Sequence, residues 1–221
     1  MAAQIFRTVL RGAALGTMVW GYQSLGGLAI DQIMRAQYGG HLQYLTIQGL
    51  ALACLTMATG LLNDLLPVFG TIKRSFMIIA LPLSVVISSI YWSLIIFMPD
   101  LILQALPGDS APSSSSDAPA PFRIPLSMDL ALHAVPCISL ILDFSFFEKK
   151  YTKYEVKLAP IVAVVFSLWY TLWVEHCGKM NNGIFPYPFL TENPLNVRIG
   201  IYIGATLLSI FSFRAINALH P

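Results

Sequence analysis

The sequence predicts an all-α fold: an integral membrane bundle of six transmembrane helices, with the N and C termini in the cytosol. Of its 221 residues, 56% are hydrophobic and only 11% are charged, whereas a soluble domain has about 25% charged residues. The mean hydropathy is +0.69. Six apolar runs of about 20 residues each, the length that crosses a bilayer, account for roughly half of the chain. We therefore expect residues 1–221 to form a single transmembrane domain.

Three of the apolar runs lie in the N-terminal half, at about 12–30, 42–62 and 76–98. The first contains several glycines, and such small residues let neighbouring helices approach closely. Arg7 and Arg11 precede this run, and no convincing cleavage site follows it. We therefore expect a retained span rather than a signal peptide.

The segment at 107–121 is the one low-complexity stretch, with five serines and four prolines in 15 residues. A segment of this composition cannot bury a core and is expected to be a flexible linker. Three further apolar runs follow it, at about 126–147, 158–175 and 197–217. The linker thus divides three predicted helices from three others.

Positive charges are distributed unequally between the two ends of the predicted spans. Nine Lys and Arg residues fall on the side of the termini and four on the other side, which places the termini in the cytosol by the positive-inside rule. The nine are Arg7, Arg11, Lys73, Arg74, Lys149, Lys150, Lys153, Lys157 and Arg214. A net charge of only +2 gives no basic face, so we expect no nucleic-acid partner. A multi-pass protein of the endoplasmic reticulum or plasma membrane is expected, with membrane lipids as its surroundings.

The chain lacks the patterns that mark metal and cofactor enzymes. Cys54, Cys137 and Cys177 are widely spaced and odd in number, so they predict neither a disulfide framework nor a metal site. Four histidines are too few for a membrane di-iron enzyme, and only His133 lies well inside a span. No P-loop, HExxH, GxSxG or GxGxxG motif is present. We expect neither a metal nor an organic cofactor.

Thr46 and His133 are the candidate catalytic pair. Both predicted spans run inward from the outer face, and a rise of about 1.5 Å per residue places Thr46 about 6 Å and His133 about 10 Å from that face. A histidine inside a span is a functional hypothesis by default, whereas a membrane threonine often only packs or bonds its own helix. Nucleophilic acyl transfer requires at least a hydroxyl group and a base at the same depth in the bundle.

Several residues near the candidate pair have two possible roles each. Asp129 lies one turn before His133 on the same face, where it either orients the imidazole or is a solvated residue at the helix start. Cys137, one turn deeper, is a rival nucleophile, but apolar burial blunts a thiol and favours packing. Asp143 lies too deep to reach Thr46. Glu175 and His176 lie at the outer end of the fifth run. They are either supporting groups of the site or polar residues at the membrane interface.

Aromatic residues gather toward the outer ends of the predicted spans. This distribution is typical of the aromatic belt of a membrane protein, although some of these side chains have the alternative of lining a lipid-chain pocket. They are Tyr91, Trp92, Trp169, Trp173 and Tyr187.

Three stretches carry a family likeness. GGHLQYLTIQGL (Gly39–Leu50), DLALHAVPCISLILD (Asp129–Asp143) and WVEHCGKMNNGIFPYPFL (Trp173–Leu190) resemble, in that order, the androgen-induced family of six-span membrane hydrolases, which cleave fatty-acid esters of hydroxy fatty acids. The resemblance implies a catalytic threonine at Thr46 and a catalytic histidine at His133. The family usually has Asn at the position of Asp129 and Glu at that of Asp143.

Together these observations lead us to expect a hydrolase of lipid esters, with Thr46 as nucleophile and His133 as base. Its substrate is expected to enter from the bilayer, and a backbone amide or Tyr44 is the candidate oxyanion donor. The alternative is a lipid transporter or lipid-binding protein that uses the same cavity, with His133 as a proton or carboxylate partner. A scaffold without chemistry is the third possibility.

Overall fold

The computed structural model describes residues 2–103 and 123–220, and within these ranges the chain is helical and contains no strand. The linker predicted at 107–121 lies outside them. Short 3₁₀ turns precede α3 (η1, Gly40–Gln43), precede α4 (η2, Pro67–Phe69) and follow α4 (η3, Pro99–Leu101). The helices are α1 (Ala2–Leu25), α2 (Ala29–Ala36), α3 (Leu45–Leu65), α4 (Gly70–Phe97), α5 (Leu126–His133), α6 (Val135–Phe147), α7 (Lys153–Met180), α8 (Pro188–Thr191) and α9 (Leu195–Leu219).

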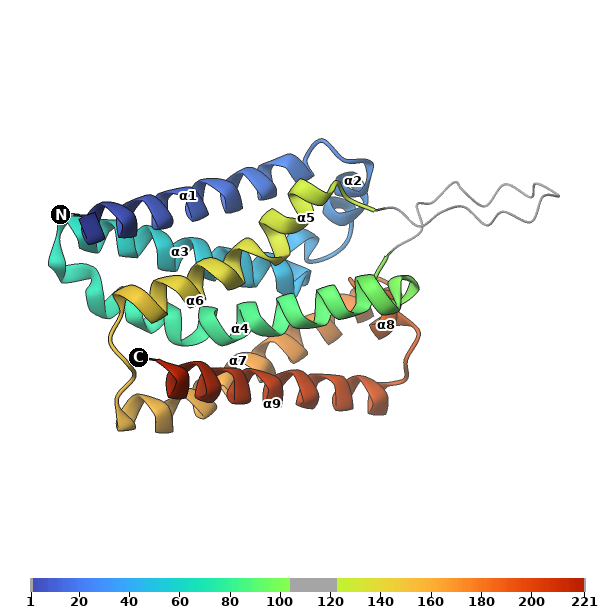
Figure 1. Cartoon of the computed structure of the whole chain (residues 1–221). Coiled ribbons are helices and arrows are strands. Elements are labelled where there is room, and N and C mark those ends of the chain that lie inside the picture. The colour runs from blue at the N-terminus through green and yellow to red at the C-terminus, as the bar shows by residue number, and fades with distance from the viewer. Residues whose placement is uncertain (1, 104–122, 221) are drawn as a thin grey trace.

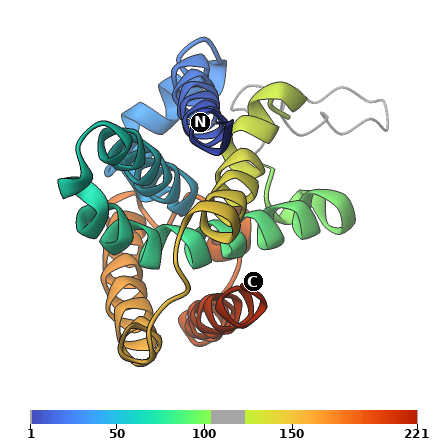
Figure 2. The ribbon, with the colours of Figure 1, turned by 60° about the vertical axis from the view of Figure 1, so that its left-hand side comes forward.

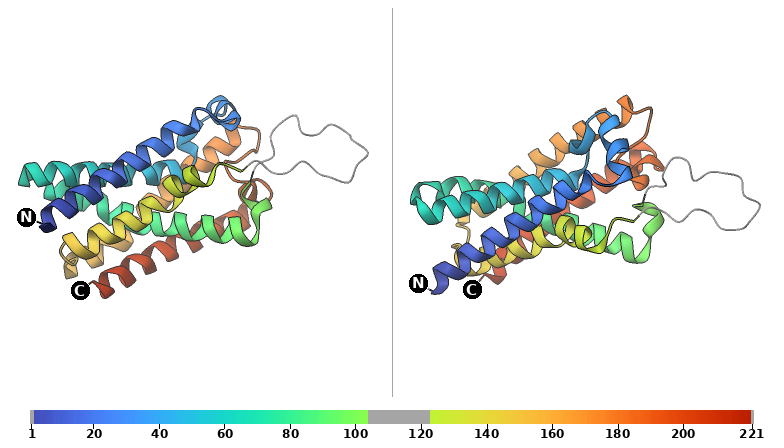
Figure 3. Two further views of the ribbon diagram at one scale, coloured as in Figure 1. Left: turned by 45° about the horizontal axis from the view of Figure 1, so that its top comes forward. Right: turned by 90° about the horizontal axis from the view of Figure 1, so that it is seen from above.

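The long helices lie side by side as a bundle, and both ends of the chain lie at the same end of it (Figure 1). Helix α1 packs on α3, α5 and α6, and α3 packs on α4. The hairpin of α7 and α9 lies against α4, as the turned view shows (Figure 2). The short helices α2 and α8 lie at the end of the bundle away from the termini (Figure 3).

Four helices, α3, α4, α7 and α9, are long and apolar enough to cross a membrane, and α5 and α6 together make a fifth candidate that bends by 41°. Helix α1 is also long enough but not apolar enough to be counted with them. The described residues therefore support four or five of the six predicted spans.

Several helices begin or end at other residues than the predicted runs, for example α1 at Ala2, α4 at Gly70 and α7 at Lys153 and Met180. Two further differences have reasons of local geometry. The first run does not continue to residue 30, because α1 ends at Leu25 and the Gly26–Gly27 pair forms a turn before the separate helix α2. Glycine is the residue that most readily leaves the helical conformation. The second span begins at Leu45 rather than 42, because Gly39 and Gly40 adopt positive φ values of 87° and 49° and lead into η1.

A buried ionic cluster joins four helices near the end that holds the termini. Arg11 donates from Nε to Asp143 Oδ1 at 2.7 Å and from Nη1 to Asp64 Oδ1 at 2.8 Å and the Gly60 carbonyl at 3.0 Å. Lys73 forms ion pairs with Asp143 and with Glu148. The Arg11, Lys73 and Asp143 side chains are 2%, 1% and 0% exposed. Two of the nine positive charges assigned to the cytosolic side therefore lie inside the bundle, where carboxylates compensate them.

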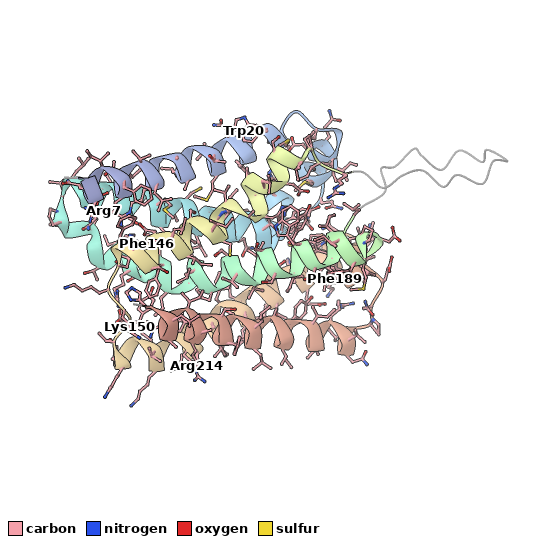
Figure 4. The ribbon with its side chains drawn as sticks, viewed as in Figure 1. Arg7, Trp20, Phe146, Lys150, Phe189 and Arg214 are labelled. Carbon is pink, nitrogen blue, oxygen red and sulfur yellow. The ribbon has the colours of Figure 1, made fainter. Side chains whose placement is uncertain are left out.

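Other basic residues lie where the sequence places them relative to the termini. Arg7, Lys150 and Arg214 lie toward the end of the bundle that holds both termini, and Phe189 lies toward the opposite end (Figure 4). This grouping supports the assignment of the basic residues to one end of the bundle. Which side of the membrane that end faces is tested by labelling.

A cysteine at Lys150 and one at Glu192 test the orientation, because both positions are exposed and they lie at opposite ends of the bundle. We expect Glu192→Cys to react with an impermeant maleimide from outside intact cells, and Lys150→Cys to react only after permeabilisation. The wild-type protein gives the background from the native cysteines. The reverse pattern would invert the assigned orientation.

Removing one charge from the buried cluster is expected to destabilise the protein. Asp143→Asn leaves Arg11 and Lys73 without their shared carboxylate, and breaking a buried pair in this way costs about 3–5 kcal/mol. Thermal unfolding of the purified protein in detergent measures the loss, with the exposed Asp100→Asn as the control. Equal melting temperatures for the two variants would show that the cluster does not stabilise the bundle.

Candidate active site

A cavity of about 240 Å³ lies at the end of the bundle away from the termini and continues inward between α4, α7 and α9. Thr46 and His133 both line it, as does Tyr44, the residue that precedes α3. The two residues predicted as a catalytic pair therefore lie on one cavity, and their position in one layer of the bundle stays a prediction. Its remaining walls are predominantly apolar.

His133 is the last residue of α5, at the break between α5 and α6. The break follows from Pro136, which has no N–H to donate to the Leu132 carbonyl and whose ring clashes with it. The bend of 41° separates the two helices directly after the imidazole. The same proline therefore ends α5 at the residue that faces the cavity.

Asp129 fixes the tautomer of this imidazole. Nδ1 of His133 lies 3.2 Å from the Asp129 carbonyl oxygen and 3.2 Å from its Oδ1. A carbonyl oxygen can only accept a hydrogen bond, so Nδ1 is the donor here, and in the neutral form of this imidazole the lone pair is on Nε2. Because the Asp129 side chain is 0% exposed, Asp129 is not a solvated residue at the helix start.

Tyr91 completes this group from α4. Its ring stacks on the His133 imidazole with the centroids 3.5 Å apart and the planes parallel, and its hydroxyl donates to Asp129 Oδ1. Tyr91 is buried and lines the cavity. Three side chains from two helices therefore hold one another, and the imidazole has no room to tilt toward α4.

Thr46 lies in the first turn of α3, where the backbone N–H groups have no partner within the helix. The Leu45 N–H donates to the Tyr187 hydroxyl oxygen at 2.9 Å. Burial raises the pKa of the Tyr187 hydroxyl, and hydrogen bonds with the side chain and backbone of Thr46 lower it by less. Tyr187 therefore caps the start of α3 from a distant segment and contacts the candidate nucleophile.

The segment before α3 is held in place by α7. The Trp173 indole N–H donates to the Leu42 carbonyl at 2.9 Å, and Tyr170 donates to the Gln43 carbonyl at 3.1 Å. Gly39 has φ of 87°, and a Cβ at this position would lie 2.6 Å from Cys177 Sγ. Only glycine fits there, and this close approach fixes where the chain turns into α3.

The other predicted site residues lie elsewhere. His176 is exposed, outside the cavity lining, with Nε2 at 3.3 Å from the Tyr38 hydroxyl. Glu175 pairs with Arg198 and accepts from Tyr202, which does line the cavity. Asp143 belongs to the ionic cluster, as its predicted depth requires. Cys137 is absent from the lining of the cavity within the described residues, which accords with a packing role.

Tyr91 and Tyr187 contact the candidate catalytic residues, and sequence reasoning did not predict these contacts. Both were predicted as aromatic-belt residues, with a lipid-chain pocket as the alternative, and both line the cavity. The only signal that pointed to Tyr187 was its place in the family-like stretch Trp173–Leu190. Among the described residues, no group of three or more His, Cys, Asp or Glu is arranged to hold a metal ion.

Comparison with known proteins places the chain in a family. A UPF0641 membrane protein of Schizosaccharomyces pombe is 27% identical over 218 residues, which cover 96% of this chain and 89% of that protein. No solved structure matches. The family model described as FAR-17a/AIG1-like protein matches residues 15–221. Its match confirms the likeness carried by the three stretches, and the chain is a membrane protein that belongs to the FAR-17a/AIG1-like family.

Proposed function

We propose that this protein is a membrane-embedded hydrolase of lipid esters, with Thr46 as nucleophile and His133 as general base. The observation that carries the proposal is that Thr46 and His133 line one apolar cavity, and that the Nδ1 of His133 is held by a buried aspartate. A nucleophile, a base and a group that orients the base form the pattern of covalent acyl transfer.

The chemistry follows from the tautomer. Nε2 of His133 takes the proton of the Thr46 hydroxyl as Oγ1 attacks the ester carbonyl carbon, and the imidazolium then gives that proton to the departing alkoxide. The products of this half-reaction are the free alcohol and an acyl group on Thr46. Water, deprotonated by the same Nε2, attacks the acyl carbonyl. The carboxylic acid leaves, and Thr46 Oγ1 takes back its proton.

The start of α3 is suited to the negative charge of the tetrahedral intermediate. The N-terminal end of a helix carries partial positive charge, and Thr46 is in this first turn of α3. The Leu45 N–H is bonded to the Tyr187 hydroxyl, and the Ile47 and Gln48 N–H groups are bonded to the Tyr44 carbonyl. Electrostatic stabilisation of the developing oxyanion contributes a large part of the rate enhancement in acyl transfer. Threonine is a hindered alcohol, so we expect slow acylation by a preferred ester rather than broad esterase activity.

The packing of α7 and α9 supports access from the bilayer. In the most apolar window of each of these helices 17% of the residues are buried, against 50% for α3 and 44% for the segment containing α4. Helices α7 and α9, which line the cavity, are therefore less buried in the bundle than α3 and α4. We propose that the lipid ester enters beside this hairpin, directly from the membrane.

Substitution of Thr46 tests the nucleophile. Thr46→Ala removes the hydroxyl, so we expect the loss of hydrolysis and of labelling by a serine- and threonine-directed fluorophosphonate. Thr46→Ser retains the oxygen, so we expect partial hydrolysis and partial labelling. Labelling of the purified protein, followed by peptide mass spectrometry, is the measurement. Full activity in a folded Thr46→Ala protein would remove Thr46 from the mechanism. Retained lipid binding with no labelling of the wild type would favour a lipid-binding protein or transporter instead.

Substitution of Tyr91 tests the orienting group. Tyr91→Phe keeps the ring stacked on His133 but removes the hydroxyl that donates to Asp129. Because a well-placed general base contributes about 10²–10⁴ to the rate, we expect kcat to fall about tenfold or more while KM changes little. Tyr154→Phe, at an exposed position outside the cavity, is the matched control. Equal kcat values for the two variants would show that the tyrosine hydroxyl does not act on the base.

A further inference from the structure

The cavity is far longer than a site for the ester group alone requires. Its lining residues on α4 run from Ile78 to Tyr91, a rise of about 20 Å at about 1.5 Å per residue. Tyr91, which stacks on His133, marks the catalytic end of this span. The cavity therefore continues inward along α4 for about two thirds of a hydrocarbon core of about 30 Å.

Helices α7 and α9 line the inner part of the cavity together with α4. Helices α4 and α7 begin at the same end of the bundle (Figure 1), and Ile78 and Ala163 lie at comparable distances from those beginnings. Ala163 is thus at the inner end of the cavity, opposite the catalytic pair, and its small side chain leaves room there. Ala205 on α9 lines the wall between that end and Tyr202.

The lining favours a hydrocarbon occupant. Within the described part of the chain no Asp, Glu, Lys or Arg lines the cavity, and α4 contributes mainly isoleucine, leucine and valine. The hydroxyls of Ser167 and Thr206 are already satisfied, since Thr206 donates to the Tyr202 carbonyl at 2.7 Å and lies 2.5 Å from Ser167 Oγ. Hydroxyls that already have hydrogen-bond partners do not require a polar partner from a ligand. Ser167 and Thr206 are therefore compatible with a methylene chain beside them.

We infer that the inner part of the cavity is a pocket for one long acyl chain, the chain that Thr46 receives, and that Ala163 sets the length it accepts. The inference rests on the proposed function. The chain would lie along the bundle axis with its carbonyl carbon at Thr46 and its methyl end near Ile78. When the ester C–O bond breaks, the acyl group stays in this pocket on Thr46 Oγ1. The alcohol, which takes the proton from His133, leaves toward the outer lining formed by Ile102, Leu103 and Ile124.

Chain-length profiles test this pocket in the full-length protein in nanodiscs. With butyryl, octanoyl and palmitoyl esters of para-nitrophenol, kcat/KM of the wild type should rise with chain length. Ala163→Phe shortens the pocket, so we expect kcat/KM for the palmitoyl ester to fall by about tenfold or more, with the butyryl ester unchanged. Val164→Phe, at the adjacent exposed position outside the lining, should leave the profile unaltered. A uniform loss for all three esters in Ala163→Phe, or no loss, would overturn the assignment.

Photocrosslinking tests the pocket without relying on hydrolysis, so that its failure and the failure of the proposed function are distinguishable. The probe is a non-hydrolysable amide analogue of the palmitoyl ester with a diazirine at the methyl end of the acyl chain. Crosslinks near Ile78 and Ala163, lost in Ala163→Phe and kept in Val164→Phe, support the pocket even if no ester is cleaved. Crosslinks confined to the outer lining or to exposed residues of α7 and α9 would refute it.

Discussion

The fold depends on one constraint: polar groups that leave water inside this bundle must find their partners within the protein. An unpaired charge in a medium of low dielectric constant is costly. The ionic cluster of Arg11, Lys73 and Asp143 meets this requirement by drawing α1, α4 and α6 together. Toward the other end of the bundle, Asp129 meets it through Tyr91 and His133. The same requirement that stabilises the bundle therefore also orients the candidate base.

The candidate nucleophile depends on a different kind of support. Thr46 lies at a helix start, where local hydrogen bonds run out, and residues more than a hundred positions later in the chain supply the missing partners. The stretches around Gly39 and Tyr187 look unrelated in the sequence. In space they form one unit, because the N–H and C=O groups of one are satisfied by the side chains of the other. The family-like stretches coincide with this unit.

The lengths of the apolar runs predict much of the fold, because the thickness of the bilayer sets the length of a spanning helix. The starting and ending residues of the 126–147 run agree with the structure. Hydropathy does not reveal the break after His133, which depends on Pro136, or the burial of Arg11, which depends on Asp64 and Asp143 across the bundle. For the site, helical spacing correctly pairs Asp129 with His133, since the i, i+4 relation is local. Tyr91 and Tyr187 were missed because their contacts come from other helices, and position along a span says nothing about the direction of a ring.

The ionic cluster and the candidate catalytic pair lie toward opposite ends of the bundle, and among the described residues none of the cluster lines the cavity. This separation has an evolutionary consequence. Most substitutions destabilise a protein, and those that survive are the ones a stability margin can absorb. Here the residues of the ionic cluster are not residues of the cavity wall, so a substitution in the wall leaves the ion pairs in place. A substitution that changes which ligand the cavity accepts therefore does not have to break the ion pairs that join α1, α4 and α6. Ligand preference and stability therefore depend on different sets of residues in one small protein.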